Sequence, residues 1–119
     1  MSFATVINCI DGRFQTSVNT FLRQRFDVSF IDTITEAGPV ALLSDRLPEN
    51  VVHDINISIN AHASQQIAVV AHEGCAGNPV ADDKQQAQCL EAAIKLRAEF
   101  ANCKVIALWA TLDGAVAEL

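Results

Sequence analysis

Basic residues are scarce in this sequence, and they do not cluster. Of the 119 residues, 14 are acidic and 8 are Lys or Arg, which gives a net charge of −6. A protein that binds nucleic acid needs a concentrated positive surface. We therefore expect no nucleic-acid partner.

Long apolar runs are also missing, although 50% of the residues are hydrophobic. None approaches the ~20 residues that span a bilayer. Residues 2–10 lack the basic start of a secretory signal and resemble a strand instead. The sequence therefore predicts a cytoplasmic protein with no membrane partner.

A disulfide framework is not evident either. The four cysteines are Cys9, Cys75, Cys89 and Cys103, and their spacing is not that of a small secreted domain. In a reducing compartment, cysteines that accompany a histidine more often mark a metal or catalytic site than a cross-link. Neither Cys89 nor Cys103 lies beside a histidine in the sequence, and we expect both to be structural.

No repeat, linker or low-complexity segment divides the chain, so residues 1–119 are expected to form one domain. Short apolar segments predict strands at 3–8, 27–33, 66–71, 104–111 and 115–119. Helical spacing predicts helices at 14–26, from 39, at 49–63 and from 82. On the last of these we expect Leu90, Ala93 and Ile94 to face the core.

This alternation predicts an α/β fold. We expect a mostly parallel sheet of about four strands, a short antiparallel edge strand after the Asp113-Gly114 turn, and helices on both faces.

Two of the predicted strands end in residues that suit a metal. A C-x-D-x-R motif, Cys9 to Arg13, follows the first strand, and an H-x-x-C motif, His72 to Cys75, follows the third. Ligands bind at the carboxyl ends of parallel strands. Zinc takes Cys sulfur and His nitrogen, and a catalytic zinc has three protein ligands and one open position. Each motif alone is weak, but together they predict a zinc site made by Cys9, His72 and Cys75.

Both motifs resemble those of the β-class carbonic anhydrases. Residues 30–38, FIDTITEAG, are similar to that family's second strand and the loop after it. Residues 108–119, LWATLDGAVAEL, are similar to its closing hairpin. The resemblance covers nearly the whole chain, in order.

The resemblance implies that Cys9, His72 and Cys75 ligate Zn²⁺. It implies that Asp11 accepts a hydrogen bond from the metal-bound water, and that Arg13 pairs with Asp11 and holds it off the metal. The activity it implies is the reversible hydration of carbon dioxide to bicarbonate by zinc-bound hydroxide.

The chain departs from the family around the expected substrate pocket. Thr35-Glu36-Ala37 precedes Gly38, and Ala76 follows Cys75, where the family usually has Arg-Asn and Gly. Two alternatives therefore stay open. One is a related zinc hydrolase of carbonyl sulfide or carbon disulfide, and the other is a non-catalytic zinc protein whose fourth ligand is Asp11.

Self-association is expected on two grounds. The chain is apolar for its length, with a mean hydropathy of +0.24, and a small domain has much surface for its volume. In the family that the chain resembles, the pocket forms between subunits. We therefore expect a homodimer or higher homo-oligomer that acts on a small molecule.

Overall fold

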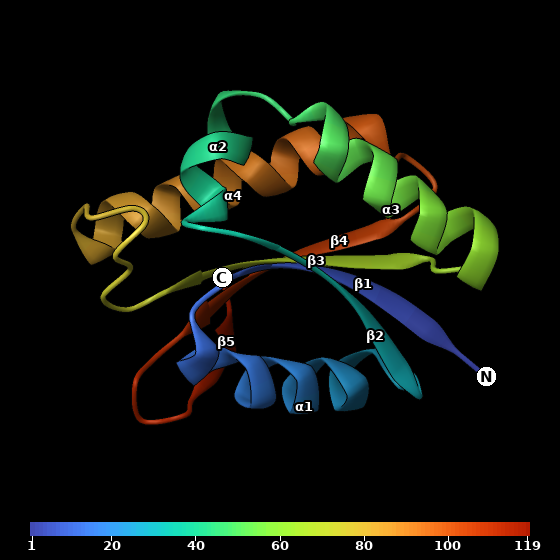
Figure 1. Cartoon of the computed structure of the whole chain (residues 1–119), viewed down its shortest axis with the longest axis horizontal. Helices are drawn as coiled ribbons and strands as arrows, with labels where there is room; N and C mark the ends of the chain where they lie inside the picture. Colours follow the sequence, from blue (N-terminus) through green and yellow to red (C-terminus); the bar gives the residue numbers. More distant parts are fainter.

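A five-stranded sheet lies between two layers of helices in the computed structural model, which describes residues 1–119 (Figure 1). The strands are β1 (Phe3–Cys9), β2 (Phe30–Glu36), β3 (Gln66–His72), β4 (Lys104–Ala110) and β5 (Val116–Glu118). Their order across the sheet is β2-β1-β3-β4-β5. The first four are parallel, and β5 is antiparallel to β4. The predicted α/β fold is confirmed.

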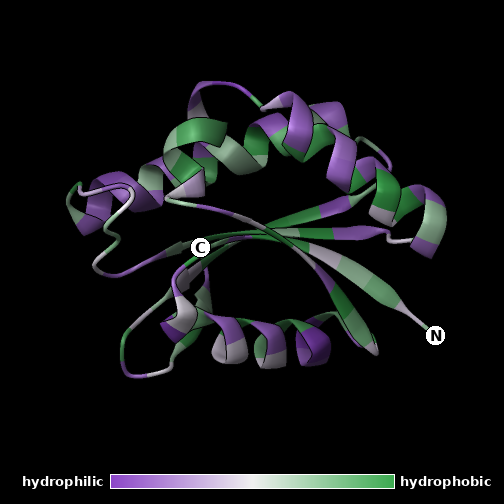
Figure 2. Ribbon diagram, viewed as in Figure 1, coloured by the Kyte–Doolittle hydropathy of each residue, from purple (hydrophilic) through white to green (hydrophobic).

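The helices cover both faces of the sheet. They are α1 (Gln15–Phe26), which follows a 3-10 turn at Gly12–Phe14, and α2 (Pro39–Asp45), α3 (Glu49–His62) and α4 (Asp82–Glu99). In Figure 1, α1 lies below the sheet and the other three lie above it. Apolar residues line the inner surfaces of these layers (Figure 2) and form one core on each face. None of the helices combines the length and the apolar character that crossing a bilayer requires.

The second strand lies three residues later than the sequence predicts. Residues 27–33 were expected, whereas β2 is Phe30–Glu36. Asp27 instead ends α1 in the left-handed conformation, with φ 53° and ψ 53°, and its N–H reaches the carbonyls of Arg23 and Gln24. The C-terminal cap of α1 therefore lies where the sequence predicts the start of the second strand.

The inner face of α4 is also rotated from the expected one. Leu90 and Ile94 are 45% and 55% exposed, whereas Gln85 and Cys89 are buried. Buried residues recur at helical spacing from Gln85 through Cys89 to Leu96, so a glutamine lies on the core side.

Strands β1 and β3 pair over three residues only, and the pairing stops before either strand ends. Their ladder runs from Thr5–Ile67 to Ile7–Val69, whereas β3 stays paired with β4 as far as His72. The carboxyl ends of β1 and β3 therefore separate, and residues from both can face the space between them.

Candidate metal centre

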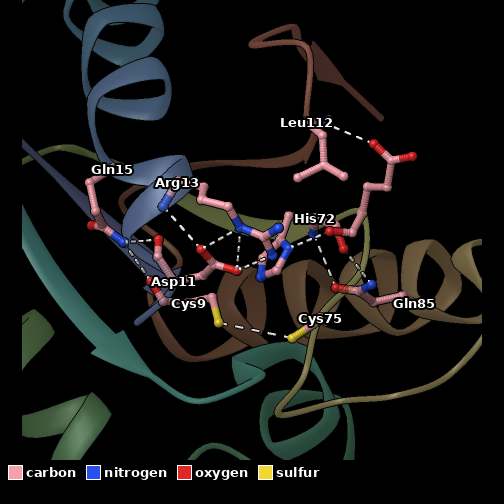
Figure 3. Close-up of polar contacts among 9 residues, drawn as sticks. Cys9, Asp11, Arg13, Gln15, His72, Cys75, Gln85 and Leu112 are labelled. Atoms are coloured by element: carbon pink, nitrogen blue, oxygen red, sulfur yellow. Dashed lines mark hydrogen bonds and ion pairs between the residues drawn. The ribbon is translucent and has the colours of Figure 1, made fainter.

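Cys9, His72 and Cys75 converge where β1 and β3 separate (Figure 3). One ligand atom from each lies within 4.8 Å of the other two. The two Sγ atoms are 3.9 Å apart. All three residues are buried, with exposed fractions of 3%, 1% and 5%. The structure thus brings together the three residues that the sequence predicts as ligands.

The His72 ring is held with one nitrogen free. Its Nδ1 lies 2.9 Å from the carbonyl oxygen of Glu73, which can only accept, so Nδ1 carries the proton. Phe14 stacks on the ring at 4.1 Å between centroids. Nε2 is buried and has no hydrogen-bond partner. A buried polar atom without a partner is costly, and a metal ion would give this lone pair a partner.

The placement of the two cysteine sulfurs is better explained by a bound metal ion than by two neutral thiols. Burial, and then the nearby Cys9 sulfur, raise the pKa of the Cys75 thiol. A cation would offset both effects, because it stabilises thiolates directly. Two sulfurs and an imidazole nitrogen form a donor set that zinc prefers.

The other two cysteines lie outside the cluster. No cysteine forms a disulfide. Cys89 lies on the buried face of α4, where its Sγ donates to the carbonyl of Val69, and burial raises its pKa to about 12. Cys103 is half-buried among residues that pack against the core.

Asp11 and Arg13 form a closed ion pair beside the ligands. The Arg13 Nη2 atom lies 2.7 Å from Asp11 Oδ2, and Nε lies 3.1 Å from Oδ1. The Arg13 backbone N–H also donates to Oδ1. Hydrogen bonds from the Arg13 side chain and then its backbone lower the pKa of the Asp11 carboxyl to about 2. Asp11 is therefore ionised near neutral pH, and it is not a member of the ligand cluster.

Three side-chain amides hold the ligands, and sequence reasoning missed all of them. Gln85 makes two hydrogen bonds to the backbone of His72. Asn8 accepts the N–H of Cys9, and Gln15 donates to the Cys9 carbonyl. Contacts between a side-chain amide and a backbone group follow no periodic pattern in the sequence, so the residue types alone do not reveal them.

Two glycines let the metal loop, residues 73–81 between β3 and α4, approach the β2–α2 turn. A Cβ on Gly77 would lie 2.8 Å from the Ala37 carbonyl carbon, and one on Gly38 would lie 2.7 Å from the Gly77 carbonyl carbon. Either distance is shorter than atoms tolerate. Gly74, between His72 and Cys75, has a φ of +67°, which a residue with a Cβ rarely adopts. The loop geometry therefore depends on these glycines.

Comparison with known proteins agrees with this geometry. Residues 1–119 match the model of a family described as "Putative carbonic anhydrase". No curated protein matches the sequence closely enough to count as a relative.

Several carbonic anhydrases of known structure are similar to this chain in fold. The enzyme from Glaciozyma antarctica is 12% identical, with a TM-score of 0.66 over 97% of this chain and 80% of that one. The β-carbonic anhydrase isoform I of Trichomonas vaginalis is 20% identical, with a TM-score of 0.55 over 96% of this chain and 80% of that one. One of two tetrameric β-carbonic anhydrases from Sordaria macrospora is 10% identical, with a TM-score of 0.59 over 100% of this chain and 81% of that one.

Identities this low show a shared fold, while the match to the family model extends over the whole chain. On that match, the chain belongs to this carbonic anhydrase family.

Proposed function

We propose that this protein is a zinc enzyme that reversibly hydrates carbon dioxide to bicarbonate. Cys9, His72 and Cys75 would hold the zinc. The observation that carries the proposal is the buried, unpartnered Nε2 of His72 beside two cysteine sulfurs in a chain of this family. In such a site zinc lowers the pKa of a bound water and supplies a nucleophile near neutral pH.

Asp11 and Arg13 have complementary roles in this proposal. Asp11 stays ionised and can only accept, so it orients the attacking water by taking its hydrogen bond. Arg13 holds the Asp11 carboxylate through a fork of two side-chain nitrogens. This pairing turns the carboxylate away from a role as fourth ligand, which supports an open metal position over a closed, non-catalytic site.

We further propose that the substrate pocket is completed by a second copy of the chain. None of the five surface cavities, of about 210 to 440 Å³, is lined by Cys9, His72 or Cys75. β2 is an edge strand, and its Phe30 is 47% exposed. Light scattering should give a mass of at least twice the 12.8 kDa of one chain. A monomer at micromolar concentration would contradict this part of the proposal.

Stopped-flow measurement of carbon dioxide hydration tests the activity. The zinc-loaded protein should accelerate the reaction, and Cys9→Ser should abolish the acceleration. Cys103→Ser is the matched control, because Cys103 lies outside the cluster. Full activity in Cys9→Ser would refute the proposed site.

The same protein should be assayed with carbonyl sulfide. Two exposed apolar residues, Ile10 beside Asp11 and Leu112 on the loop that Glu73 binds, suit an uncharged linear substrate. Release of sulfide without carbon dioxide hydration would assign the zinc site to the hydrolase alternative.

A further inference from the structure

Gln85 is a buried polar residue that faces the metal centre from α4. Its exposed fraction is 1%, and it lies one helical turn before the buried Cys89. Its Oε1 accepts the backbone N–H of His72 at 3.0 Å, and its Nε2 donates to the His72 carbonyl at 2.6 Å. One side chain therefore occupies both backbone polar groups of one residue (Figure 3).

The sheet leaves these two groups without a strand partner. The N–H of Glu73 donates to the Ala110 carbonyl on β4. Because successive residues of a strand direct their backbone groups to opposite sides, those of His72 point toward β1. The β1–β3 ladder has already ended, at the pair Ile7–Val69.

Gln85 thus replaces the part of β1 that turns away to present Cys9. A buried N–H or C=O with no partner is rare and costly. The Gln85 amide gives a partner to both the N–H and the C=O of His72. These groups lack a strand partner because the two ligands Cys9 and His72 lie on strand ends that have separated. It also joins His72 to α4, which packs on the sheet through Cys89, Ala92 and Leu96.

We infer that Gln85 is a positioning residue that fixes His72 for metal binding. The inference rests on the proposed zinc site. The His72 ring is already constrained by Phe14 and by the Glu73 carbonyl. Gln85 constrains the backbone from which the ring projects, so that Nε2 faces the sulfurs before a metal arrives.

The test is metal affinity, measured on folded protein by competition with a chromophoric chelator. Gln85→Met keeps the volume close and removes both hydrogen bonds. Its Kd for Zn²⁺ should rise about 10- to 100-fold, the range found when partners that orient metal ligands are removed. Gln86→Met is the matched control, since Gln86 is the adjacent glutamine and makes no side-chain hydrogen bond. Its Kd should stay within about twofold of wild type.

A second readout separates positioning from mere support of the fold. Co²⁺ bound by two thiolates and an imidazole has a charge-transfer and ligand-field spectrum that reports ligand geometry. In Gln85→Met this spectrum should shift, while that of Gln86→Met should match wild type. A purely structural role would lower the thermal stability of the metal-free protein and leave Kd and the spectrum unchanged, which would overturn the inference.

The outcomes also distinguish this inference from the proposed function. A wild-type protein that binds neither Zn²⁺ nor Co²⁺ would refute the metal site itself. Equal binding by wild type and folded Gln85→Met would refute only the role of Gln85. If Gln85→Met does not fold, Gln85→Asn against Gln86→Asn decides, because asparagine keeps the amide and is one methylene too short to reach both backbone groups of His72. Weaker binding by Gln85→Asn supports the inference, and equal binding overturns it.

Discussion

Four hydrogen bonds from Arg13 converge on the Asp11 carboxylate. They hold its pKa near 2, below the ordinary value of 3.8. A carboxyl whose pKa is lower in the folded state adds stability above its ordinary pKa, and this stability is lost as the pH falls through the folded value. Asp11 therefore contributes stability above about pH 4.

Asp11→Asn removes this charge at every pH. We expect the stability advantage of wild type over Asp11→Asn to shrink as the pH falls from about 4 to about 2. Urea unfolding of the metal-free proteins measures it without interference from metal release. A pH-independent difference would show that the ion pair does not stabilise the fold.

In zinc-loaded protein, Asp11→Asn should lower the rate of carbon dioxide hydration at least about 10-fold.

Single residues also show what the sequence could and could not reveal. The convergence of Cys9, His72 and Cys75 was predictable, because each lies in a short motif at a strand end and the carboxyl ends of parallel strands meet at one edge. The role of Gln85 was not predictable, because Lys84, Gln85 and Gln86 are three consecutive polar residues and nothing in the sequence says which one is buried. Only the rotation of α4 distinguishes the buried glutamine from its neighbours.

Between whole segments, the metal loop approaches the β2–α2 turn closely. A Cβ on Gly77 would lie 2.9 Å from the Gly38 nitrogen, and one on Gly38 would lie 2.7 Å from the Gly77 carbonyl carbon. A methyl group on Gly77 would therefore push the loop that carries Cys75 away from this turn.

Gly77→Ala should therefore destabilise the protein by about 1–3 kcal/mol. It should also weaken zinc binding, because Cys75 moves with the loop. Gly12→Ala is the control for stability, since nothing lies within 4 Å of its Cβ position, and it should change the unfolding free energy by less than about 0.5 kcal/mol. Equal effects of the two substitutions would contradict the close-contact argument.

A buried hydroxyl network joins α3 to the sheet. Ser58 Oγ donates to Asp32 on β2 at 2.7 Å and also contacts Thr5 Oγ1 on β1 at 2.7 Å. His62 Nδ1 lies 2.7 Å from the same Asp32 oxygen. Since the one proton of Ser58 goes to Asp32, Thr5 must donate to Ser58.

Ser58→Ala breaks this network at its centre and leaves Thr5 without that acceptor. We expect a loss of about 1–3 kcal/mol in the free energy of unfolding, measured by urea denaturation. Ser44→Ala should cost less than about 0.5 kcal/mol, because Ser44 only contacts the Ala41 carbonyl of its own helix. A loss in Ser58→Ala no larger than that in Ser44→Ala would show that the network adds nothing.

Strands and helices were largely predictable from hydrophobic periodicity, including the parallel sheet and its closing antiparallel strand. The differences arise where short-range rules compete. The left-handed cap at Asp27 moved the start of β2. On α4 the polar Gln85 is buried, whereas the more apolar Leu90 and Ile94 are exposed. Tertiary packing decides where such a strand begins and which side of such a helix is buried, and the local sequence does not reveal that packing.

In the whole molecule, a metal would join the first strand to the middle of the chain. Cys9 and Cys75 are 66 positions apart. Because only the folded chain brings these sulfurs together, zinc binding should stabilise the native state by mass action.

Adding Zn²⁺ should therefore raise the unfolding temperature. At free zinc 1,000 times above Kd the stabilisation is about 4 kcal/mol. Differential scanning calorimetry should show a rise in Tm that EDTA reverses and that Mg²⁺ does not produce. Cys75→Ser should lose most of the rise, and an undiminished rise in that variant would place the metal elsewhere.

The strand order bears on how the protein is made. Of the five strands of this sheet β1 comes first in the chain, yet it lies between β2 and β3. Until β3 is synthesised, one edge of β1 stays unpaired, and such edges invite association with other chains. Cys9 meets His72 only after β1 has been enclosed on both sides. A bound metal would thus report that β1 and β3 have come together in a newly made chain, and not that α4, β4 and β5, which are synthesised later, have folded.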